Sequence, residues 1–416
     1  MSESSIRLTH TTKQINGTVQ LTGSKSESNR ALIIKALSKG KVVIENLSSA
    51  DDTILLTKAL QDATAEGTGT KTIDIGPAGT AMRFMTSYLN LLPGDFILTG
   101  TARMQQRPIG ILVDALKDIG ADVHYKNKPG FPPLHIEGKM WQSKDQVSIK
   151  GDVSSQYISS LLLIASSLKK GLTINIEGEL TSRPYVTMTL NMLAESGIQH
   201  QWEGNSIKIA PQEAQETTIY IEPDWSAASY WYAMVALAEE GEIRLPGLKK
   251  NSLQGDIAIA EIMIHFGVKT TFEEKGILLQ KTAEKSDKTL FDFKECPDLA
   301  QTVVVVAAAL KRNVSFTGLE TLKIKETDRI AALQNEIAKF GAKLTAEGEV
   351  YHLDSSAVAE PGCISIATYE DHRMAMAFAP LALVFNEIKI EEPHVVEKSY
   401  PAYWEHLSTQ GFSIQK

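Results

Sequence analysis

The chain has 416 residues, of which 43% are hydrophobic and 22% are charged, so it can bury sizeable cores in two or three domains. Its formal net charge of -8 argues against nucleic acid or a membrane surface as a partner. Cys296 and Cys363 are the two cysteines. Because the first residues lack the apolar core of a signal peptide, we expect a cytoplasmic protein without a disulfide framework.

The first informative segment covers residues 21–34, where a glycine and three serines precede an apolar run. Lys25, Ser26 and Arg30 place a hydroxyl and two cations where a strand gives way to a helix, and the orphan amides of a helix N-terminus attract anions. A phosphate or carboxylate site and an ordinary serine N-cap both fit this segment. The choice depends on whether the rest of the chain repeats the pattern.

Segments of one kind recur, each with a polar start, an apolar helical run, a turn and an alternating strand. They occupy residues 23–46, 76–100, 151–178, 222–247, 296–318 and 368–392. Between them lie amphipathic helices that end in a glycine followed by a strand. The glycines are Gly120, Gly197, Gly267, Gly341 and Gly411, and they suit the left-handed position that follows many helices.

A sixth amphipathic helix begins at Asp51, but polar residues 65–70 replace a clear strand. We therefore expect a shortened first unit, with residues 61–73 as its uncertain segment. The alternation predicts six α/β units of roughly seventy residues and two domains of three, formed by residues 23–222 and by residues 1–22 with 223–416. Polar helix starts can then converge on a cleft between domains; a duplicated α/β fold without such a site is the alternative.

Cations and hydroxyls gather at these helix starts although the protein is acidic. In Lys325-Glu326-Thr-Asp328-Arg329, the lysine and arginine would share a helix face and repel by a few tenths of a kcal/mol. A bound anion would remove that repulsion. Alternatively, Glu326 and Asp328 neutralise the pair on a solvated face.

The signatures of several enzyme classes are missing from the sequence. The nine histidines form no HExxH and there is no CxxC pair, so we expect no metal site. A phosphate-binding GxxxxGK[ST] loop, a strand-linked GxGxxG and a GxSxG elbow are also missing. What remains is a set of cations and hydroxyls, with Asp298 or Glu326 for proton transfer. Such a set suits a small substrate that carries several negative charges.

Six motifs in order together resemble the 5-enolpyruvylshikimate-3-phosphate synthase family of enolpyruvyl transferases. They are Gly23-Ser-Lys-Ser-x-Ser-Asn-Arg30, Ala78-Gly-Thr-Ala-Met-Arg83, Arg107-Pro-Ile-Gly110, Val153-Ser-Ser-Gln156, Lys325-Glu-Thr-Asp-Arg329 and Asp371-His-Arg-Met-Ala-Met376. The match extends from residue 21 to residue 401. It implies an inside-out α/β barrel in each of two domains, built from three βαβαββ units and closing on the substrates in the cleft between them.

The resemblance implies transfer of the enolpyruvyl group of phosphoenolpyruvate to the 5-hydroxyl of shikimate 3-phosphate, with release of phosphate through a tetrahedral intermediate. This reaction belongs to the shikimate pathway of aromatic amino acid biosynthesis and requires no cofactor. We expect a monomer whose partners are these small molecules. The alternatives are an enolpyruvyl transferase for UDP-N-acetylglucosamine and a non-catalytic protein that binds phosphorylated metabolites.

Site residues follow from the same resemblance, position by position. It implies that Asp298 meets the reacting hydroxyl. From the chemistry of an enol ether we assign Asp298 as the acceptor of the hydroxyl proton, with Glu326 and Lys25 as candidate proton donors. The implied shikimate 3-phosphate site comprises Lys25, Ser26, Arg30, Ser154, Ser155, Gln156, Ser182, Asp298 and Lys325. The implied phosphoenolpyruvate site comprises Lys25, Gly79, Arg107, Gln156, Arg329, Arg373 and Lys398.

Two positions depart from the family pattern. Pro77 and Thr321 stand where the family commonly has asparagine. The resemblance also implies that the inhibitor glyphosate binds beside Gly79. We therefore expect catalysis to survive these changes, with altered affinity for substrate or inhibitor.

Overall fold

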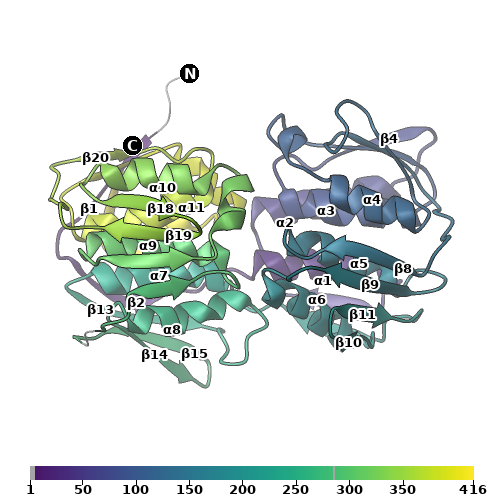
Figure 1. Ribbon diagram of the computed structural model, residues 1–416. Coiled ribbons are helices and arrows are strands. Elements are labelled where there is room, and N and C mark those ends of the chain that lie inside the picture. The colour runs from purple at the N-terminus through teal and green to yellow at the C-terminus, as the bar shows by residue number, and fades with distance from the viewer. Residues whose placement is uncertain (1–4, 284–285) are drawn as a thin grey trace. The chain divides into compact units, whose positions relative to one another are not determined.

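The computed structural model describes residues 5–283 and 286–416, and the chain divides into two compact units (Figure 1). We call Gly23–Ile221 the inserted unit, and the residues up to Thr22 together with Glu222–Lys416 the discontinuous unit. The second crossing lies one residue before the expected boundary. Glu222 belongs to the discontinuous unit because its carboxylate accepts hydrogen bonds from Trp225 Nε1 at 2.9 Å and Ser252 Oγ at 2.6 Å.

The inserted unit alternates helices and strands. Its helices are α1 (Lys25–Leu37), α2 (Asp51–Thr64), α3 (Gly79–Tyr88), α4 (Gly110–Asp118), α5 (Ser155–Ala165) and α6 (Arg183–Glu195). Its strands are β3 (Val42–Glu45), β4 (Thr70–Asp74), β5 (Asp95–Thr99), β6 (Asp122–Tyr125), β7 (Leu134–Glu137), β8 (Gln146–Lys150), β9 (Leu172–Glu177), β10 (Gln201–Glu203), β11 (Ser206–Ile209) and β12 (Thr217–Tyr220).

The discontinuous unit contains the remaining elements. Its α-helices are α7 (Trp225–Leu237), α8 (Ile259–Ile264), α9 (Ala300–Ala309), α10 (Arg329–Ala338), α11 (His372–Phe378) and α12 (Tyr403–Thr409). Its strands are β1 (Ser5–His10), β2 (Gln14–Thr18), β13 (Glu240–Pro246), β14 (Val268–Glu273), β15 (Gly276–Lys281), β16 (Leu290–Asp292), β17 (Val314–Thr317), β18 (Lys343–Glu347), β19 (Val350–Asp354), β20 (Ile364–Ile366), β21 (Ile388–Glu391) and β22 (Phe412–Gln415). Short 3-10 turns, named where they matter below, connect several of them.

In the part of the chain that the structure describes, five four-stranded sheets share one topology. Their orders are β4-β5-β7-β6, β8-β9-β11-β10, β2-β13-β15-β14, β16-β17-β19-β18 and β20-β21-β1-β22. In each sheet the first two strands are parallel and the last two pair antiparallel, as in β8 with β9 (Val147 opposite Ile174) and β10 with β11. A helix connects the two parallel strands in four of these sheets, which is the usual crossover for such pairs; between β2 and β13 the whole inserted unit precedes helix α7. The expected βαβαββ units are therefore confirmed.

The first unit is shortened, as its polar sequence predicted. Its sheet contains β12 and β3, which are parallel with Thr218 opposite Val43. After α2 the chain forms no hairpin at residues 65–69 and enters β4 at Thr70, and β4 pairs with β5 in the next sheet. The fold thus has five complete units and one that ends after its second helix.

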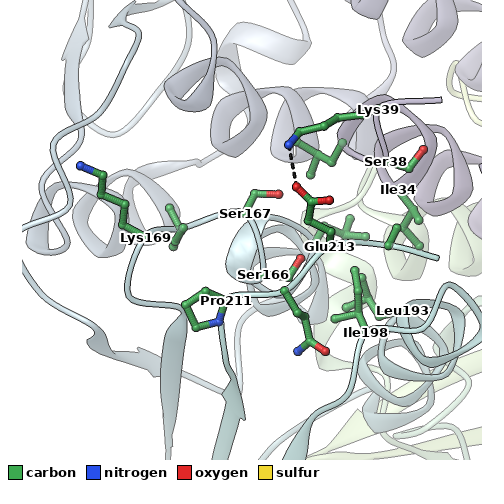
Figure 2. A pocket seen from close by; sticks show the side chains of 15 residues that line it. Ile34, Ser38, Lys39, Ser166, Ser167, Lys169, Leu193, Ile198, Pro211 and Glu213 are labelled. Carbon is green, nitrogen blue, oxygen red and sulfur yellow. Dashed lines mark hydrogen bonds and ion pairs between the residues drawn. The ribbon is translucent and has the colours of Figure 1, made fainter. Parts of the chain in front are cut away.

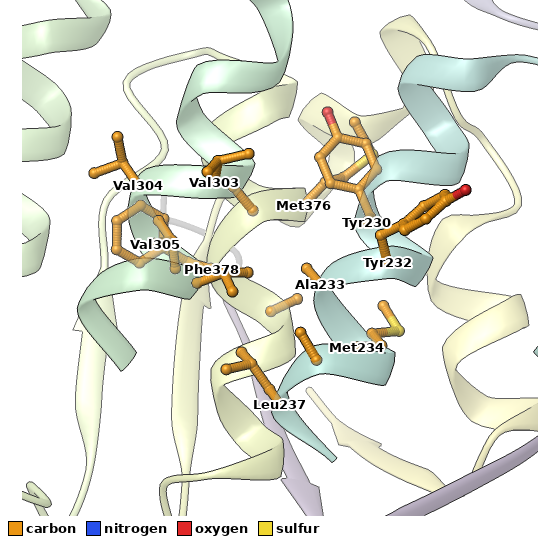
Figure 3. Packing of buried hydrophobic residues seen from close by; sticks show 14 of the residues in the cluster. Tyr230, Tyr232, Ala233, Met234, Leu237, Val303, Val304, Val305, Met376 and Phe378 are labelled. Carbon is orange, nitrogen blue, oxygen red and sulfur yellow. The ribbon is translucent and has the colours of Figure 1, made fainter. Parts of the chain in front are cut away.

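The core of each unit lies among its helices, and the sheets cover them. In the discontinuous unit α7, α9 and α11 contact one another (Figure 3), with Tyr230 and Leu237 of α7 near Val303 of α9 and Phe378 of α11. Nearly every residue of these helices is buried, and helices that are apolar all round belong in a core. We call them inner helices, together with α1, α3 and α5 of the inserted unit. None of the described helices is long and apolar enough to cross a membrane.

Candidate active site

In the discontinuous unit, Asp298 lies among three cations at the start of inner helix α9. Its Oδ1 is 2.9 Å from Arg329 NH1 and 3.6 Å from Lys325 Nζ, and its Oδ2 is 3.1 Å from Arg373 NH2. The side chain is 20% exposed. Burial opposes its ionisation, but the charges of Arg373, Lys325 and Arg329 lower the pKa of Asp298 well below its ordinary value.

Arg329 connects Asp298 to two further carboxylates. Its Nε donates to Asp371 Oδ2 at 2.7 Å, and its NH2 donates to Glu326 Oε2 at 2.9 Å. Glu326 Oε1 in turn lies 3.1 Å from Lys398 Nζ. Burial opposes the charge of Arg329, but Asp371, Glu326 and Asp298 raise its pKa. The six candidate residues of this unit therefore form one network.

The expected helical pairing of Lys325 with Arg329 is wrong. Helix α10 begins at Arg329, where Asp328 accepts from the backbone N–H groups of Ile330 and Ala331 at 3.1 Å, while Lys325 is extended at φ -84° and ψ -150°. The alternative of a solvated face is also wrong, because the Arg329 side chain is 2% exposed. Both cations instead contact Asp298, whose carboxylate compensates the buried charge of Arg329.

In the inserted unit, the start of α1 positions Lys25. Ser24 is the N-cap of α1 and accepts from the Glu27 N–H at 3.4 Å, which follows the expected serine capping. Lys25 Nζ lies 3.0 Å from Oδ2 of Asp52, a buried residue at the start of α2. The ammonium is therefore held between the first two helices of the chain.

Arg30 joins three helices of the inserted unit. Its Nε donates to Thr189 Oγ1 at 2.7 Å, its NH1 to the Ser26 carbonyl at 2.9 Å, and its NH2 to Ser159 Oγ and the Tyr185 carbonyl at 3.3 Å. Burial lowers its pKa to about 10. These contacts orient the guanidinium through neutral acceptors.

The starts of α3 and α5 come together around Gly79. A Cβ on Gly79 would lie 2.6 Å from Arg107 NH1, so glycine permits the close approach of this guanidinium. Next to it, Gln156 Nε2 donates to Thr80 Oγ1 at 3.3 Å. Ser154 is the N-cap of α5 and accepts from the Gln156 N–H at 3.3 Å. These candidates thus share one region of the inserted unit.

Ser182 has an unusual backbone conformation at the start of α6. It is a buried N-cap residue with φ 54° and ψ 40°. Residues other than glycine rarely adopt this left-handed region, and such strain concentrates at functional sites. Ser155, the first residue of α5, is also buried. Both serines are therefore polar groups at helix N-termini, which suit an anion.

The inserted unit also has a pocket of about 430 Å³ at a different place (Figure 2). It is lined by the C-terminal part of α1 with Ile34, by Leu193 of α6, and by an ion pair of 2.7 Å between Lys39 and Glu213. Lys25 and Ser26 lie at the opposite, N-terminal end of α1. The pocket and the candidate residues therefore occupy opposite ends of the helices.

The family model for EPSP synthase (3-phosphoshikimate 1-carboxyvinyltransferase) matches residues 9–407. The chain belongs to this family. A protein named 3-phosphoshikimate 1-carboxyvinyltransferase from Bacteroides fragilis (strain YCH46) is 49% identical over 404 residues, which cover 97% of each chain. One from Neisseria meningitidis serogroup B (strain ATCC BAA-335 / MC58) is 36% identical over 414 residues, covering 94% of this chain and 95% of the relative.

Solved structures of this family and of a related transferase have the same fold. EPSP synthase from Acinetobacter baumannii aligns with a TM-score of 0.80 at 21% identity, covering 99% of this chain and 100% of that one. The enolpyruvyl transferase NikO from Streptomyces tendae aligns with a TM-score of 0.75 at 14% identity, covering 99% of both chains. The inside-out α/β fold implied by the sequence motifs is thus confirmed.

Sequence reasoning found Asp298 and Glu326 but missed other carboxylates that contact the site. Asp52 contacts Lys25, and Asp371 contacts Arg329. A third missed carboxylate, Asp256, lies in the 3-10 turn Gly255–Ala258 that leads into α8, and it contacts Ser226. Asp52 and Asp256 occupy polar starts of the second helix in their units, as Ser182 does in its own. The repeat pattern could therefore have found them if acidic starts had been weighed beside cationic ones.

Proposed function

We propose that this protein transfers the enolpyruvyl group of phosphoenolpyruvate to the 5-hydroxyl of shikimate 3-phosphate and releases phosphate. Relatives named for this activity match the chain over nearly its whole length. The observation that carries the proposal is the network in which Lys325, Arg329 and Arg373 surround Asp298. It combines cations for anionic substrates with a carboxylate for proton transfer. We place the activity in the cytoplasm, in the shikimate pathway, and assign it to a monomer.

The charge of the two substrates explains the size of the site. Together they carry two phosphates and two carboxylates, which need many charge-assisted hydrogen bonds. We assign shikimate 3-phosphate to Lys25, Ser26, Arg30, Ser154, Ser155, Gln156, Ser182, Asp298 and Lys325. We assign phosphoenolpyruvate to Lys25, Gly79, Arg107, Gln156, Arg329, Arg373 and Lys398. In this proposal residues of both units act on the same pair of substrates.

The proposed reaction is an addition followed by an elimination. Glu326 or Lys25 donates a proton to the methylene carbon of phosphoenolpyruvate, which makes C2 electrophilic. The 5-hydroxyl attacks C2 while Asp298 accepts its proton, and a tetrahedral adduct forms. Loss of a proton from the new methyl group and departure of phosphate regenerate the double bond. Excluding water and aligning the reactants lower the barrier by several kcal/mol in such reactions.

The environment of Asp298 links its basicity to substrate binding. Three cations lower its pKa, and a carboxylate with a low pKa is a weak base. Anionic substrates bound to Lys325, Arg329 and Arg373 would compensate those charges, so the pKa of Asp298 would rise. The base would then become effective when both substrates are present.

A phosphate-release assay tests the proposal. We expect release from phosphoenolpyruvate when shikimate 3-phosphate is the acceptor, and none when UDP-N-acetylglucosamine is offered. Release with UDP-N-acetylglucosamine but not with shikimate 3-phosphate would identify the enolpyruvyl transferase for the nucleotide sugar. Binding of shikimate 3-phosphate, measured by calorimetry, without any phosphate release would identify a non-catalytic relative. Either result would contradict the proposal.

A further inference from the structure

Ser226 lies at the start of inner helix α7, close to Arg373. It is the second residue of α7, and its Oγ accepts a hydrogen bond from Arg373 NH2 at 3.3 Å. The same hydroxyl donates to Asp256 Oδ2. Because its proton is committed to Asp256, Ser226 presents a lone pair to Arg373. The three groups therefore form a directed chain of hydrogen bonds from guanidinium to hydroxyl to carboxylate, which we call the relay.

The carboxylate of Asp256 is buried, which is energetically unfavourable for a charged group. It is 3% exposed in the 3-10 turn Gly255–Ala258 that leads into α8. Burial and the charges of Asp298 and Asp224 raise its pKa to about 6, although the charge of Arg373 and the hydrogen bond from Ser226 lower it. A buried carboxylate costs free energy unless it is compensated. The charge of Arg373 opposes the rise in pKa, and Ser226 connects Asp256 to this guanidinium.

Arg373 has partners on two sides. NH1 donates to Tyr230 Oη at 3.4 Å and to the Asp298 carbonyl at 3.3 Å, and NH2 donates to Ser226 Oγ at 3.3 Å and Asp298 Oδ2 at 3.1 Å. In the proposed reaction the Asp298 carboxylate becomes the base and turns to the substrate hydroxyl. Ser226 then remains to orient NH2. The direction of this hydrogen bond depends on Asp256, which accepts the hydroxyl proton.

We propose that Asp256 is a positioning residue that acts through Ser226 to orient Arg373 for phosphoenolpyruvate. This inference rests on the proposed function, which gives Arg373 to that substrate. Ser226 and Asp256 contact Arg373 rather than the substrate. They also give a role to the starts of α7 and α8, which the sequence motifs left without one.

Two variants test the relay. We expect Asp256→Asn and Ser226→Ala each to raise KM for phosphoenolpyruvate about tenfold, while KM for shikimate 3-phosphate stays within about twofold. The double variant should raise it no further than the stronger single variant, because residues that act in series are not additive. Ser226→Thr keeps the hydroxyl and should restore most of the affinity. Circular dichroism establishes folding, and Ser226→Ala carries the test if Asp256→Asn does not fold.

The pH dependence distinguishes positioning from mere structural support. Above pH 6 the Asp256 carboxylate is ionised and the relay is intact; below pH 6 it is protonated and resembles the amide of Asp256→Asn. For phosphoenolpyruvate, the ratio of the KM of Asp256→Asn to the KM of the wild type should therefore fall from about ten at pH 7.5 towards one at pH 5. Taking the ratio cancels the titration of phosphoenolpyruvate itself.

Glu222→Gln is the matched control, because Glu222 is a buried carboxylate of the same unit that accepts hydrogen bonds from Trp225 Nε1, the Lys249 backbone N–H and Ser252 Oγ. It should leave KM for phosphoenolpyruvate unchanged. Variants of Asp256 and Ser226 that lose thermal stability with an unchanged KM, or that combine additively, would overturn the inference. An inactive wild-type protein would overturn the proposed function and this inference together. An active wild type with unaffected variants would overturn the inference alone.

Discussion

The two units hold their candidate cations in different ways. In the discontinuous unit, carboxylates compensate the cations, as Asp298 does for Arg329 and Arg373. In the inserted unit, hydroxyls and backbone carbonyls orient Arg30, and Asp52 is the carboxylate that contacts Lys25. In the proposed function, an anionic substrate therefore competes with carboxylates for the cations of one unit, and with neutral acceptors for Arg30 in the other.

This difference suggests a division of work. A carboxylate released from its cations becomes a stronger base, so the discontinuous unit can couple binding to proton transfer. The charge of neutral acceptors does not change when an anion binds, so they cannot couple binding to proton transfer. A guanidinium that they hold in place is a preorganised donor, which favours orientation of the substrate. Substitutions in the discontinuous unit should therefore reduce kcat most, and those in the inserted unit should mainly alter KM, with Lys25 as the exception that serves both.

The largest effect is expected for Asp298→Asn. The amide cannot accept the hydroxyl proton, so kcat should fall about 10³-fold, while added shikimate 3-phosphate should still raise the melting temperature. Asp292→Asn, the same substitution at an exposed position of strand β16 in this unit, should leave kcat within about twofold. Asp298→Asn with more than a tenth of wild-type turnover would remove the contrast between the two units.

A large effect is also expected for Lys25→Met. Loss of the ammonium should lower kcat/KM by about 10²-fold and leave the buried Asp52 carboxylate without its lysine, which destabilises the fold. Adding Asp52→Asn should restore the melting temperature without restoring activity. Lys41→Met is the control, since Lys41 pairs with exposed Glu213. Recovery of activity in the double variant would show that Lys25 has only a structural role.

Gly79→Ala should have an intermediate effect. The new Cβ would lie 2.6 Å from Arg107 NH1, so the guanidinium must move and KM for phosphoenolpyruvate should rise about tenfold. In the control Gly110→Ala, the atom nearest to the new Cβ is 3.4 Å from it, which is an ordinary contact. A kcat effect larger than the KM effect would contradict the orienting role of the inserted unit.

The smallest effect is expected for Ser182→Gly. Glycine tolerates the left-handed backbone, so the free energy of unfolding should rise by about 0.5 kcal/mol, while loss of the hydroxyl raises KM for shikimate 3-phosphate a few-fold. Lys311→Gly, at φ 55°, should stabilise similarly without changing KM. Equal KM values for Ser182→Gly and the wild type would remove Ser182 from the site.

Much of the fold was predictable because local signals repeat. The glycines after the amphipathic helices mark the left-handed helix ends, and Gly120 has φ 110° and Gly341 φ 93°. Serines at polar starts cap α1 and α5 as expected. The start of α10 was missed because spacing alone cannot show that an Asp328 cap excludes Lys325 from the helix. The backbone strain at Ser182 also leaves no trace in residue type.

The site was predictable only in part, since motifs identify residue types but not their partners. Lys325, Arg329 and Arg373 were recognised as cations, yet their common contact with Asp298 depends on helices far apart in the chain. Asp371 lay inside a recognised motif, but its contact with Arg329 at 2.7 Å is a tertiary feature. Asp52 and Asp256 were passed over because acidic residues at helix starts are ordinary caps.

The position of β1 has a consequence for how the chain folds during synthesis. Strand β1 pairs with β21 and β22, so residue Leu8 lies opposite Ile388 and Ile414. The inserted unit has all its residues once Ile221 has left the ribosome. Strand β1, in contrast, cannot pair until β21 and β22 have been synthesised. Strand β1 is therefore translated long before the strands with which it pairs, and an unpaired strand edge in a nascent chain is prone to aggregation.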